Sequence, residues 1–192
     1  MEKNPIHQKI ITVAGELFYT NGYNSSGVNE IIAKCGIAKA TLYSHFRSKE
    51  AICLAYLQQR HDTFLVSLKD YVAKRKKGKN QLLAIFDFLI DMYREGDFYG
   101  CWGLKTLGEL SPNQKNIFNA IQKQKTELLS YLGGLVKDNV INVSKAETEK
   151  ISGGLYLLYE SAITESHLFK NDWPIFMSRN IAPSIFSNFQ LV

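Results

Sequence analysis

The feature that most constrains the fold is a break, Cys35-Gly36-Ile37, between two short stretches with helical periodicity. Two short helices joined by a three- or four-residue turn that contains glycine form a helix-turn-helix. In that arrangement Gly36 makes the tight turn, Ile37 packs beneath it, and Leu42 anchors the second helix. The pattern predicts one helix running to about Lys34, with Ser25 or Ser26 as its cap, and another over about 38–43.

Helical periodicity continues on both sides of this break, and no convincing alternating strand pairs occur. A first helix ends at Asn21-Gly22, where Gly22 suits a left-handed cap. Ser48 caps a long fourth helix over about 49–74. Further helices are expected at 80–95, 100–109, 113–138, 144–169 and 174–190, with Pro183 kinking or breaking the last.

The sequence therefore predicts an all-α protein: an N-terminal three-helix head on a larger helical domain. The expected boundary places the head at residues 1–48 and the body at 49–192. About 48 residues are marginal as an independent fold, so we expect the head to dock on the fourth helix. No apolar run approaches the length of a membrane span, and the first residues lack the apolar core of a secretory signal.

Basic residues are concentrated in the first part of the chain, although the net charge is only +5. Residues 1–79 hold thirteen Lys/Arg against six Asp/Glu, whereas residues 80–192 hold ten against twelve. Such an asymmetry favours a basic end that meets a polyanion. The run 74–79 is expected to be a solvated loop, with a phosphate contact as the alternative.

On the helix after the break, the packing of Leu42 leaves one face for a ligand. Small side chains at Ala38 and Ala40 allow close approach to DNA. The positions near this exposed face are Lys39, Ala40, Thr41, Tyr43 and Ser44. Lys39 can reach guanine or phosphate, Thr41 can meet a base edge or a thymine methyl, and Tyr43 and His45 suit phosphate.

The stretch Val28 to Phe46, followed by Ser48-Lys49-Glu50, resembles the DNA-binding head of the TetR (tetracycline-repressor-like) family. Gly22-Tyr23 and Phe18 also match, and the resemblance covers about residues 6–60. The residues that recur in register are Gly36, Ile37, Thr41, Leu42, Tyr43, Phe46, Lys49 and Glu50. Ser26 stands where these proteins often have threonine, and Ile32 and Cys35 stand where they often have alanine.

The resemblance implies a role for each candidate DNA contact. Lys39, Ala40 and Thr41 would read bases. Ser26 would contact phosphate at a helix N-terminus, where exposed N–H groups favour an anion. Tyr43, His45 and Lys49 would hold the DNA backbone, although Tyr43 could instead pack partly on the first helix and His45 could be a surface histidine.

The resemblance also implies a helical body that binds a small molecule and dimerises. Aromatic side chains are plentiful there and most are expected to be core, but apolar walls with a few polar tips also make small-molecule sites. The candidate ligand residues are Phe86, Tyr93, Trp102, Tyr159 and Glu160. Glu160 lies in an apolar stretch, so it could meet a cation, pair with another side chain or be exposed. The stretch Phe98 to Trp102, ending at Glu109-Leu110, resembles a segment of many such regulators.

A second copy of the chain is expected, because two recognition helices read two half-sites about one DNA turn apart. Candidate apolar faces are Ile151, Leu155, Leu158 and Ala162 on one helix, and Phe176, Ile185, Phe186 and Phe189 on the next. Core and interface cannot be separated on these faces from sequence alone.

Enzyme chemistry is not expected. The four histidines have no metal-ligand spacing, and no phosphate loop or nucleophile motif occurs, so neither a metal nor a cofactor is expected. The three widely spaced cysteines suit buried thiols in the cytoplasm. Cys101 could sense oxidants or be an inert buried thiol.

The sequence thus predicts a dimeric, ligand-responsive DNA-binding regulator. In its most favoured form it is a repressor that an apolar or aromatic small molecule releases from a palindromic operator in double-stranded DNA. The alternative is a scaffold protein that keeps the head as a packing module.

Overall fold

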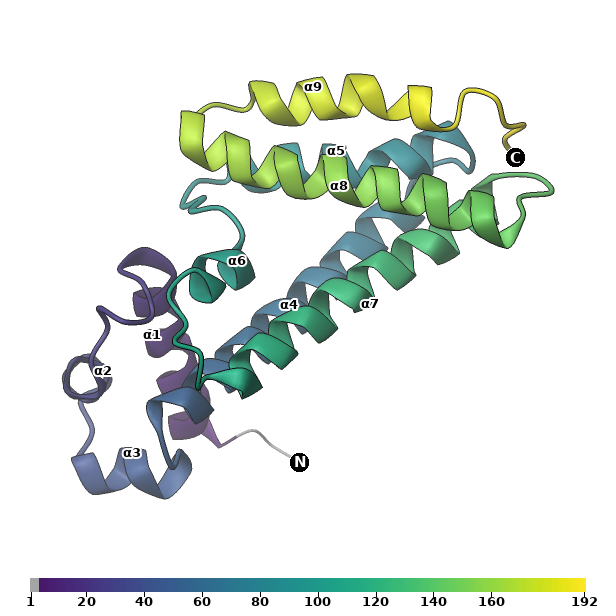
Figure 1. The fold of residues 1–192 in the computed structure, drawn as a ribbon. Helices are drawn as coiled ribbons and strands as arrows, with labels where there is room; N and C mark the ends of the chain where they lie inside the picture. Colours follow the sequence, from purple (N-terminus) through teal and green to yellow (C-terminus); the bar gives the residue numbers. More distant parts are fainter. Residues whose placement is uncertain (1–3) are drawn as a thin grey trace. The chain divides into compact units, whose positions relative to one another are not determined.

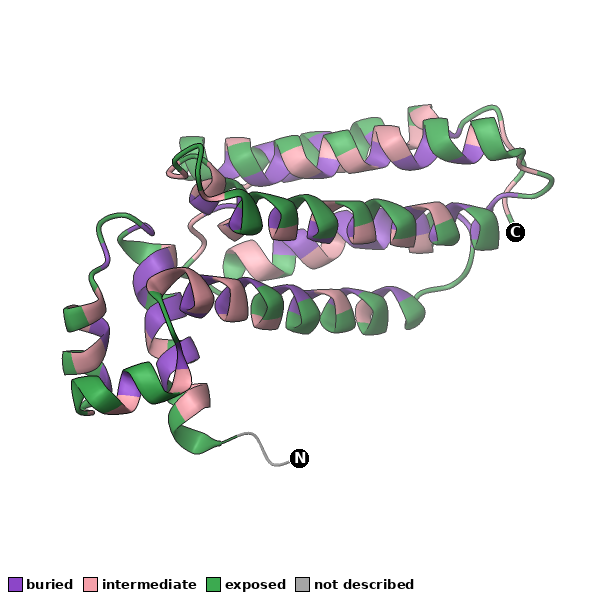
Figure 2. Cartoon of the chain, turned by 60° about the horizontal axis from the view of Figure 1, so that its bottom comes forward, coloured by how far each residue is buried: buried purple, intermediate pink, exposed green. Residues whose placement is uncertain are grey.

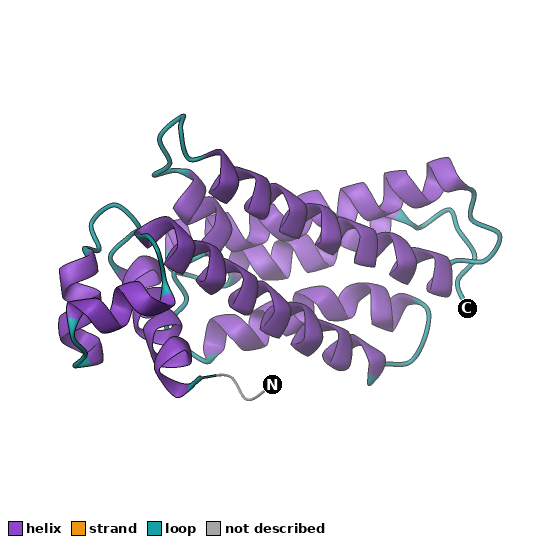
Figure 3. Cartoon of the chain, turned by 90° about the horizontal axis from the view of Figure 1, so that it is seen from below, coloured by secondary structure: helices purple, strands orange, loops and turns teal. Residues whose placement is uncertain are grey.

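The structure is a computed structural model that describes residues 4–192, and helices make up its regular elements (Figures 1 and 3). In chain order these are α1 (Pro5–Thr20), α2 (Val28–Cys35), α3 (Lys39–His45), α4 (Lys49–Ala73), α5 (Lys79–Arg94), α6 (Trp102–Leu107), α7 (Lys115–Asn139), α8 (Lys145–Phe169), α9 (Trp173–Ile181) and the 3₁₀ helix η1 (Ala182–Ile185). The all-α prediction is confirmed: across residues 4–192 the β pairing is limited to an isolated bridge between Val140 and Leu191.

The predicted break between the two short helices is present. Gly36 has φ +62° and ψ +37°, a left-handed conformation that ends α2. Its N–H and that of Ile37 donate to carbonyls of the last turn of α2, and this satisfies groups that a helix end leaves unpaired. The helix-turn-helix prediction is confirmed by α2 and α3 on the two sides of this turn.

The predicted cap of α2 is wrong. Gly27 occupies the N-cap, and neither Ser25 nor Ser26 caps the helix with its side chain. The predicted cap of α4 is confirmed, because Ser48 Oγ accepts a hydrogen bond from Ala51 N at 3.1 Å. Ser48 caps its helix and Ser26 does not, because the Ser26 hydroxyl is buried and bonds to the carbonyl of Gly22.

By their mutual contacts, the residues form two compact units. Unit 1 contains the chain up to Thr63 together with residues 102–124, and unit 2 contains residues 64–101 and 125–192. Helices α4 and α7 each contribute to both. Residues 102–124, which the sequence assigns to the body, therefore pack with the head. The functional boundary after residue 48 stays a prediction.

Unit 1 has one apolar core. The residues of α1 that face it are Ile10, Ile11, Ala14, Leu17 and Phe18. Leu42 from α3 and Ile52 and Leu57 from α4 join this core, with Ile117 and Ile121 from α7. The three helices of the head are thus held by α4 and by the start of α7.

Unit 2 packs α9 against α8 and α5. In Figure 2, buried and exposed residues alternate along these helices, as amphipathic elements require. Ile151, Leu155, Ala162 and Phe186, which the sequence left between core and interface, are buried core residues. The last helix ends at Ile181 and continues as η1, so Pro183 breaks it as predicted.

The final residues of the chain are joined to unit 2 by backbone hydrogen bonds. Ile141 N donates to Gln190 O at 2.9 Å, and Val192 N donates to Asn139 O at 3.1 Å. The buried side chain of Asn139 accepts from Gly78 N at 2.6 Å. The same asparagine therefore connects the α4–α5 loop with the C-terminal segment.

Among residues 4–192, no helix is long and apolar enough to cross a membrane.

Candidate nucleic-acid interface

The exposed face of α3 carries the predicted base-reading residues. Leu42 is fully buried and fixes the rotation of the helix. Lys39 and Ala40 are exposed on the first turn, and Thr41 is half-buried. The Tyr43 side chain is 44% exposed, so packing on α1 does not remove it from solvent. This face combines a cation, a small side chain, a hydroxyl and a phenol, which suit base edges and phosphates.

His45 lies at the end of α3 beside the first helix. Its ring centre is 6.0 Å from that of His7, and the His7 ring stacks on Phe46 at 4.5 Å. This group of rings packs α1 against the end of α3 while His45 stays partly exposed. The predicted phosphate contact of His45 is therefore sterically open.

Ser26 has a different environment from the one its predicted role requires. Its side chain is fully buried, and Oγ donates to the carbonyl of Gly22 at 2.7 Å. The hydroxyl thus closes the loop between α1 and α2 and would have to leave this bond to reach a phosphate. A phosphate contact by Ser26 therefore stays a prediction.

Lys49 also has internal partners. Its Nζ lies 3.5 Å from Asn24 O and 4.4 Å from the centre of the Tyr23 ring. Burial lowers the pKa of Lys49, while nearby Cys53 and Glu109 act in the opposite direction. These contacts hold the loop between α1 and α2 on α4, so a backbone contact by Lys49 remains a prediction.

Sequence reasoning missed the polar contacts that hold residues 102–124 on the head. Glu109 Oε2 accepts from Asn24 N at 2.6 Å, and Asn24 Nδ2 donates to Glu109 O at 2.7 Å. Gly22 lies against the same carboxylate, because a Cβ built there would be 2.5 Å from Glu109 Oε1. Its φ of +99° matches the predicted left-handed cap of α1. The sequence does hold one signal for this contact, since Glu109 lies at the end of the stretch that resembles a segment of many such regulators.

Three more side chains of this segment contact the head. Lys105 Nζ donates to Tyr19 O at 2.6 Å, which supplies a cation at the carbonyl end of α1. Gln114 Nε2 donates to Tyr23 Oη at 3.0 Å. Asn116 Nδ2 donates to Glu50 Oε1 at 2.9 Å, at the start of α4. We call Lys105, Glu109, Gln114 and Asn116 the head clamp.

The structure brings together only part of the predicted ligand site. In unit 2, the Phe86 and Tyr159 rings lie 6.2 Å apart, and both side chains are buried. Tyr93 instead packs on Phe98 at 5.1 Å. In unit 1, the Trp102 ring lies 5.5 Å below the guanidinium of Arg60.

Tyr159 is the residue of this set whose chemistry most suggests a ligand. Its hydroxyl is buried and has no hydrogen-bond partner. Burial, with nearby Glu160 and Cys101, raises the pKa of Tyr159 well above its usual value, so the phenol is neutral and able to donate. A buried donor without a partner is costly, and a bound acceptor would satisfy it.

Glu160 is paired. Both of its carboxylate oxygens lie 2.6 Å from Lys125 Nζ, and Lys125 Nζ lies 3.1 Å from Cys101 Sγ. Of the alternatives left open by the sequence, pairing with another side chain is the one observed. Lys125 was missed, although its spacing of four from Ile121 places it near the apolar side of α7.

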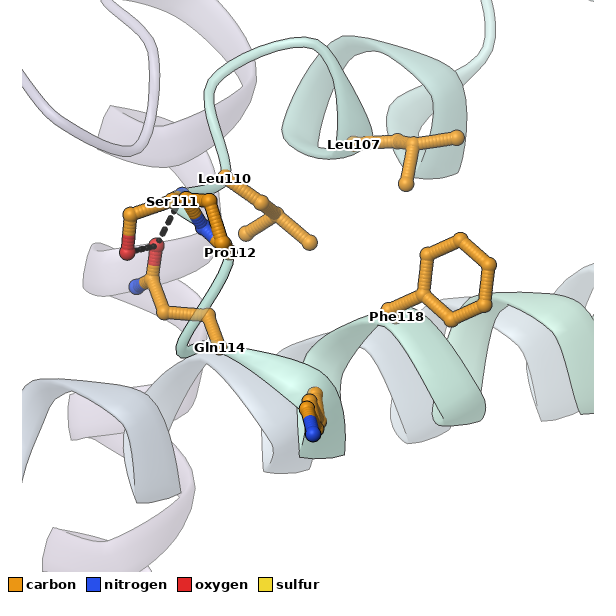
Figure 4. Close-up of a pocket in the computed structure, with 7 residues that line it drawn as sticks. Leu107, Leu110, Ser111, Pro112, Gln114 and Phe118 are labelled. Carbon is orange, nitrogen blue, oxygen red and sulfur yellow. Dashed lines mark hydrogen bonds between the residues drawn. The ribbon is translucent and has the colours of Figure 1, made fainter.

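A cavity of about 250 Å³ opens in unit 1 between α6 and α7 (Figure 4). It is lined by Leu107, Leu110, Ser111, Pro112, Gln114, Lys115 and Phe118. Gln114 Oε1 accepts from Ser111 N at 2.8 Å and so shapes one wall. None of the five predicted ligand residues lines this cavity. Over residues 4–192, no group of three His, Cys, Asp or Glu side chains is placed to hold a metal ion.

The comparisons with known proteins agree with the head geometry. Residues 10–56 match the family described as bacterial regulatory proteins, tetR family. An HTH-type transcriptional regulator in the lacX 3' region of Lactococcus lactis subsp. lactis is 27% identical over 160 residues, which cover 79% of this chain and 82% of that protein.

A second relative matches over a shorter span. The HTH-type transcriptional activator FasR of Mycolicibacterium smegmatis is 36% identical over 86 residues, which cover 42% of this chain and 39% of that protein. Among solved structures, a TetR-family transcriptional regulator from Cytophaga hutchinsonii is similar with a TM-score of 0.84 and 18% identity, covering 99% of this chain and 98% of that one. That likeness concerns the fold.

Proposed function

We propose that this chain, which belongs to the tetR family of bacterial regulatory proteins, is a dimeric repressor that a small molecule releases from a palindromic operator. Its curated relatives are transcriptional regulators, and the chain is a DNA-binding transcriptional regulator and not an enzyme. The repressor sign, the effector and the operator symmetry belong to the proposal. The cytoplasmic location also belongs to the proposal, and the three buried cysteine thiols favour it.

The observation that carries the DNA-binding proposal is the face of α3, on which Lys39, Ala40 and Tyr43 are exposed around a buried Leu42. A helix fixed in this way can present its first turn to base edges in the major groove. Because phosphate contacts release counterions, affinity should fall steeply with salt.

The test selects bound sites from random double-stranded DNA and then measures affinity by fluorescence anisotropy at two salt concentrations. Two half-sites about one DNA turn apart are expected. Lys39→Ala/Tyr43→Ala should weaken specific binding by more than about tenfold. Lys150→Ala, which removes an exposed charge from α8, should leave affinity unchanged. Absence of any preferred sequence, or equal affinity of the double variant, would instead favour the scaffold alternative.

The effector proposal rests on Phe86 and Tyr159 in unit 2. An apolar or aromatic molecule with a hydrogen-bond acceptor would pack on these rings and satisfy the buried Tyr159 hydroxyl. To act, it must bind the DNA-free state more tightly than the DNA-bound state. A screen for compounds that release the protein from operator DNA tests this proposal. Tyr159→Phe should lower the affinity of every such compound that accepts a hydrogen bond from the phenol.

The dimer proposal rests on exposed apolar side chains of α8 and α9. They are Leu157, Leu168, Phe169, Trp173, Phe176, Met177 and Ile181. Large apolar side chains gathered on two adjacent helices are typical of a surface that a second copy covers. Sedimentation analysis should give a dimer, and Leu157→Lys/Phe169→Lys should give a monomer. A monomeric wild-type chain at micromolar concentration would contradict the proposal.

A further inference from the structure

The DNA-binding proposal does not use the cluster formed by Cys101, Lys125 and Glu160 in unit 2. The ammonium of Lys125 lies 3.1 Å from Cys101 Sγ and 2.6 Å from both oxygens of Glu160. The side chains of Lys125 and Glu160 are only 22% and 13% exposed, so water screens these contacts weakly. A nucleophilic thiol, an amine and a carboxylate are thus held together in a nearly dry site.

The electrostatics of the cluster are consistent with this geometry. Burial by itself lowers the pKa of Lys125, but Cys101 and Glu160 outweigh burial and raise the pKa above its usual value. The ammonium donates to the sulfur at 3.1 Å, so the amine nitrogen lies beside the atom that an oxidant attacks. Cys101 therefore differs from a cysteine that is merely buried.

The other two cysteines provide the contrast within the same chain. Burial raises the pKa of Cys53 to about 12 and also raises the pKa of Cys35. Both belong to the core of unit 1. Cys35 Sγ donates to the carbonyl of Lys9 at 4.0 Å, whereas Cys101 Sγ accepts from the Lys125 ammonium at 3.1 Å. An oxidant should therefore select Cys101.

We propose that Cys101 and Lys125 form a reversible sulfenamide link when the protein meets a peroxide. In the first step, the sulfur attacks the peroxide oxygen, and hydrogen peroxide converts the thiol into a sulfenic acid with release of one water. In the second step, Glu160 takes one proton from the Lys125 ammonium, and the amine attacks the sulfenic sulfur. The S–N bond forms, the S–O bond breaks, and the hydroxyl leaves as water with a second proton from the nitrogen.

The bond balance of the two steps is complete. Peroxide is reduced to water, the sulfur is oxidised by two electrons, and the amine and thiol together lose two hydrogens. The contact distance of 3.1 Å requires only a local approach of two flexible side chains to close the bond. A second thiol can attack the sulfur and restore both groups.

The link would also restrain the start of α6, because Trp102, the first residue of that helix, follows Cys101 directly. Helix α6 carries Lys105, and Glu109 follows it, and both belong to the head clamp. Under the proposed function, we therefore expect oxidation to change operator affinity by about fivefold or more. The covalent chemistry itself does not depend on that function.

The test treats the full-length protein with hydrogen peroxide and measures intact mass, followed by peptide mapping. A chain about 2 Da lighter, with Cys101 joined to Lys125 and the original mass restored by dithiothreitol, is the expected result. A disulfide of Cys101 with another cysteine gives the same mass but leaves Lys125 unmodified, and this overturns the proposal. So does an unchanged mass, or Cys101 oxidised without a link.

Two variants sharpen the result. Lys125→Met should give Cys101 heavier by about 16 or 32 Da and no lighter species, because the sulfenic acid then has no amine. Lys123→Met, an exposed neighbour on α7, should behave as wild type. If Lys125→Met fails to fold, peptide mapping of the wild type still decides. If reduced protein binds no operator, the proposed function fails while the mass result stands.

Discussion

The two units of the molecule satisfy their polar side chains in different ways. In unit 1, two residues of the head clamp bind backbone groups: Glu109 accepts from Asn24 N, and Lys105 donates to Tyr19 O. In unit 2, charged side chains bind one another, as Lys125 binds Glu160 and Arg179 binds Asp87. The first kind of contact fixes where the chain runs, whereas the second fixes only two side chains.

This difference has a thermodynamic consequence. A pair of side chains can be replaced together by apolar groups of similar volume at little cost, although loss of one partner is severe. A side chain that binds the backbone has a partner that cannot be mutated away, so no second substitution restores what the first removes. The four predictions below test this contrast.

The largest effect is expected in unit 2. Lys125→Met leaves the Glu160 carboxylate in a nearly dry site and should lower the free energy of unfolding by about 3 kcal/mol. The double variant Lys125→Met/Glu160→Met should return to within about 1 kcal/mol of wild type. Urea denaturation measures both. Lys145→Met, which removes one partner of an exposed pair, is the control and should change little. A double variant as unstable as the single one would contradict the contrast.

The next effect belongs to unit 1. Gly22→Ala places a Cβ at φ +99° and against the Glu109 carboxylate, and should cost about 2 kcal/mol. Glu109→Ala in the same chain removes the crowding but also the bonds to Asn24, so it should not rescue stability. Gly134→Ala is the matched control: it lies in α7 with open space around it, and should stabilise by about 0.5 kcal/mol. Rescue by Glu109→Ala would show that crowding alone matters.

A smaller loss is expected from Glu109→Gln, which keeps the shape of the side chain and removes its charge. The bond from Asn24 N at 2.6 Å weakens, and the free energy of unfolding should fall by about 1 kcal/mol. Amide exchange of Asn24 should quicken at the same time. Glu149→Gln on the exposed side of α8 should leave both unchanged. Unaltered exchange at Asn24 would mean that the carboxylate does not hold the loop.

The smallest effect is the loss of stability that begins just above pH 9. Burial raises the pKa of Cys53 in unit 1 from 9.0 to about 12, so the unfolded chain releases this proton first as pH rises. Stability should therefore fall above pH 9, by less than about 1 kcal/mol at pH 9.5. In unit 2, burial raises the pKa of Tyr131 from 10.0 to about 12, which adds a loss only above pH 10.

The measurement is the urea midpoint at pH 8, 9.5 and 11. Cys53→Ala should reduce the change between pH 8 and 9.5 and again between pH 9.5 and 11, and Tyr131→Phe should reduce only the change above pH 10. Equal slopes in all three proteins would contradict the assignment of the alkaline loss to these groups.

The fold was predictable because its signals are local. Gly36 and Leu42 define the helix-turn-helix through spacing alone, and Pro183 breaks the last helix where expected. The exposed residues of α3 follow from the same spacing, since a buried Leu42 determines which positions face outward.

The contacts between distant segments were not predictable. Glu160 pairs with Lys125, which lies thirty-five positions away in the sequence. Asn24 donates to Glu109, which lies eighty-five positions away. Periodicity predicts which face of a helix is buried. It does not predict which polar side chain of another segment contacts that face. Ser26 shows the same limit, because its hydroxyl turns to Gly22 O and leaves the N-cap to Gly27.

The joining of the chain's last residues to Asn139 has a practical consequence for labelling. Backbone groups of Gln190 and Val192 bind Ile141 and Asn139, and the same asparagine holds Gly78. A purification tag or fluorophore attached directly after Val192 would pull on these bonds and on the basic loop that precedes Gly78. The exposed side chain of Lys150 on α8, outside the proposed dimer surface, makes a better attachment point for a probe in unit 2.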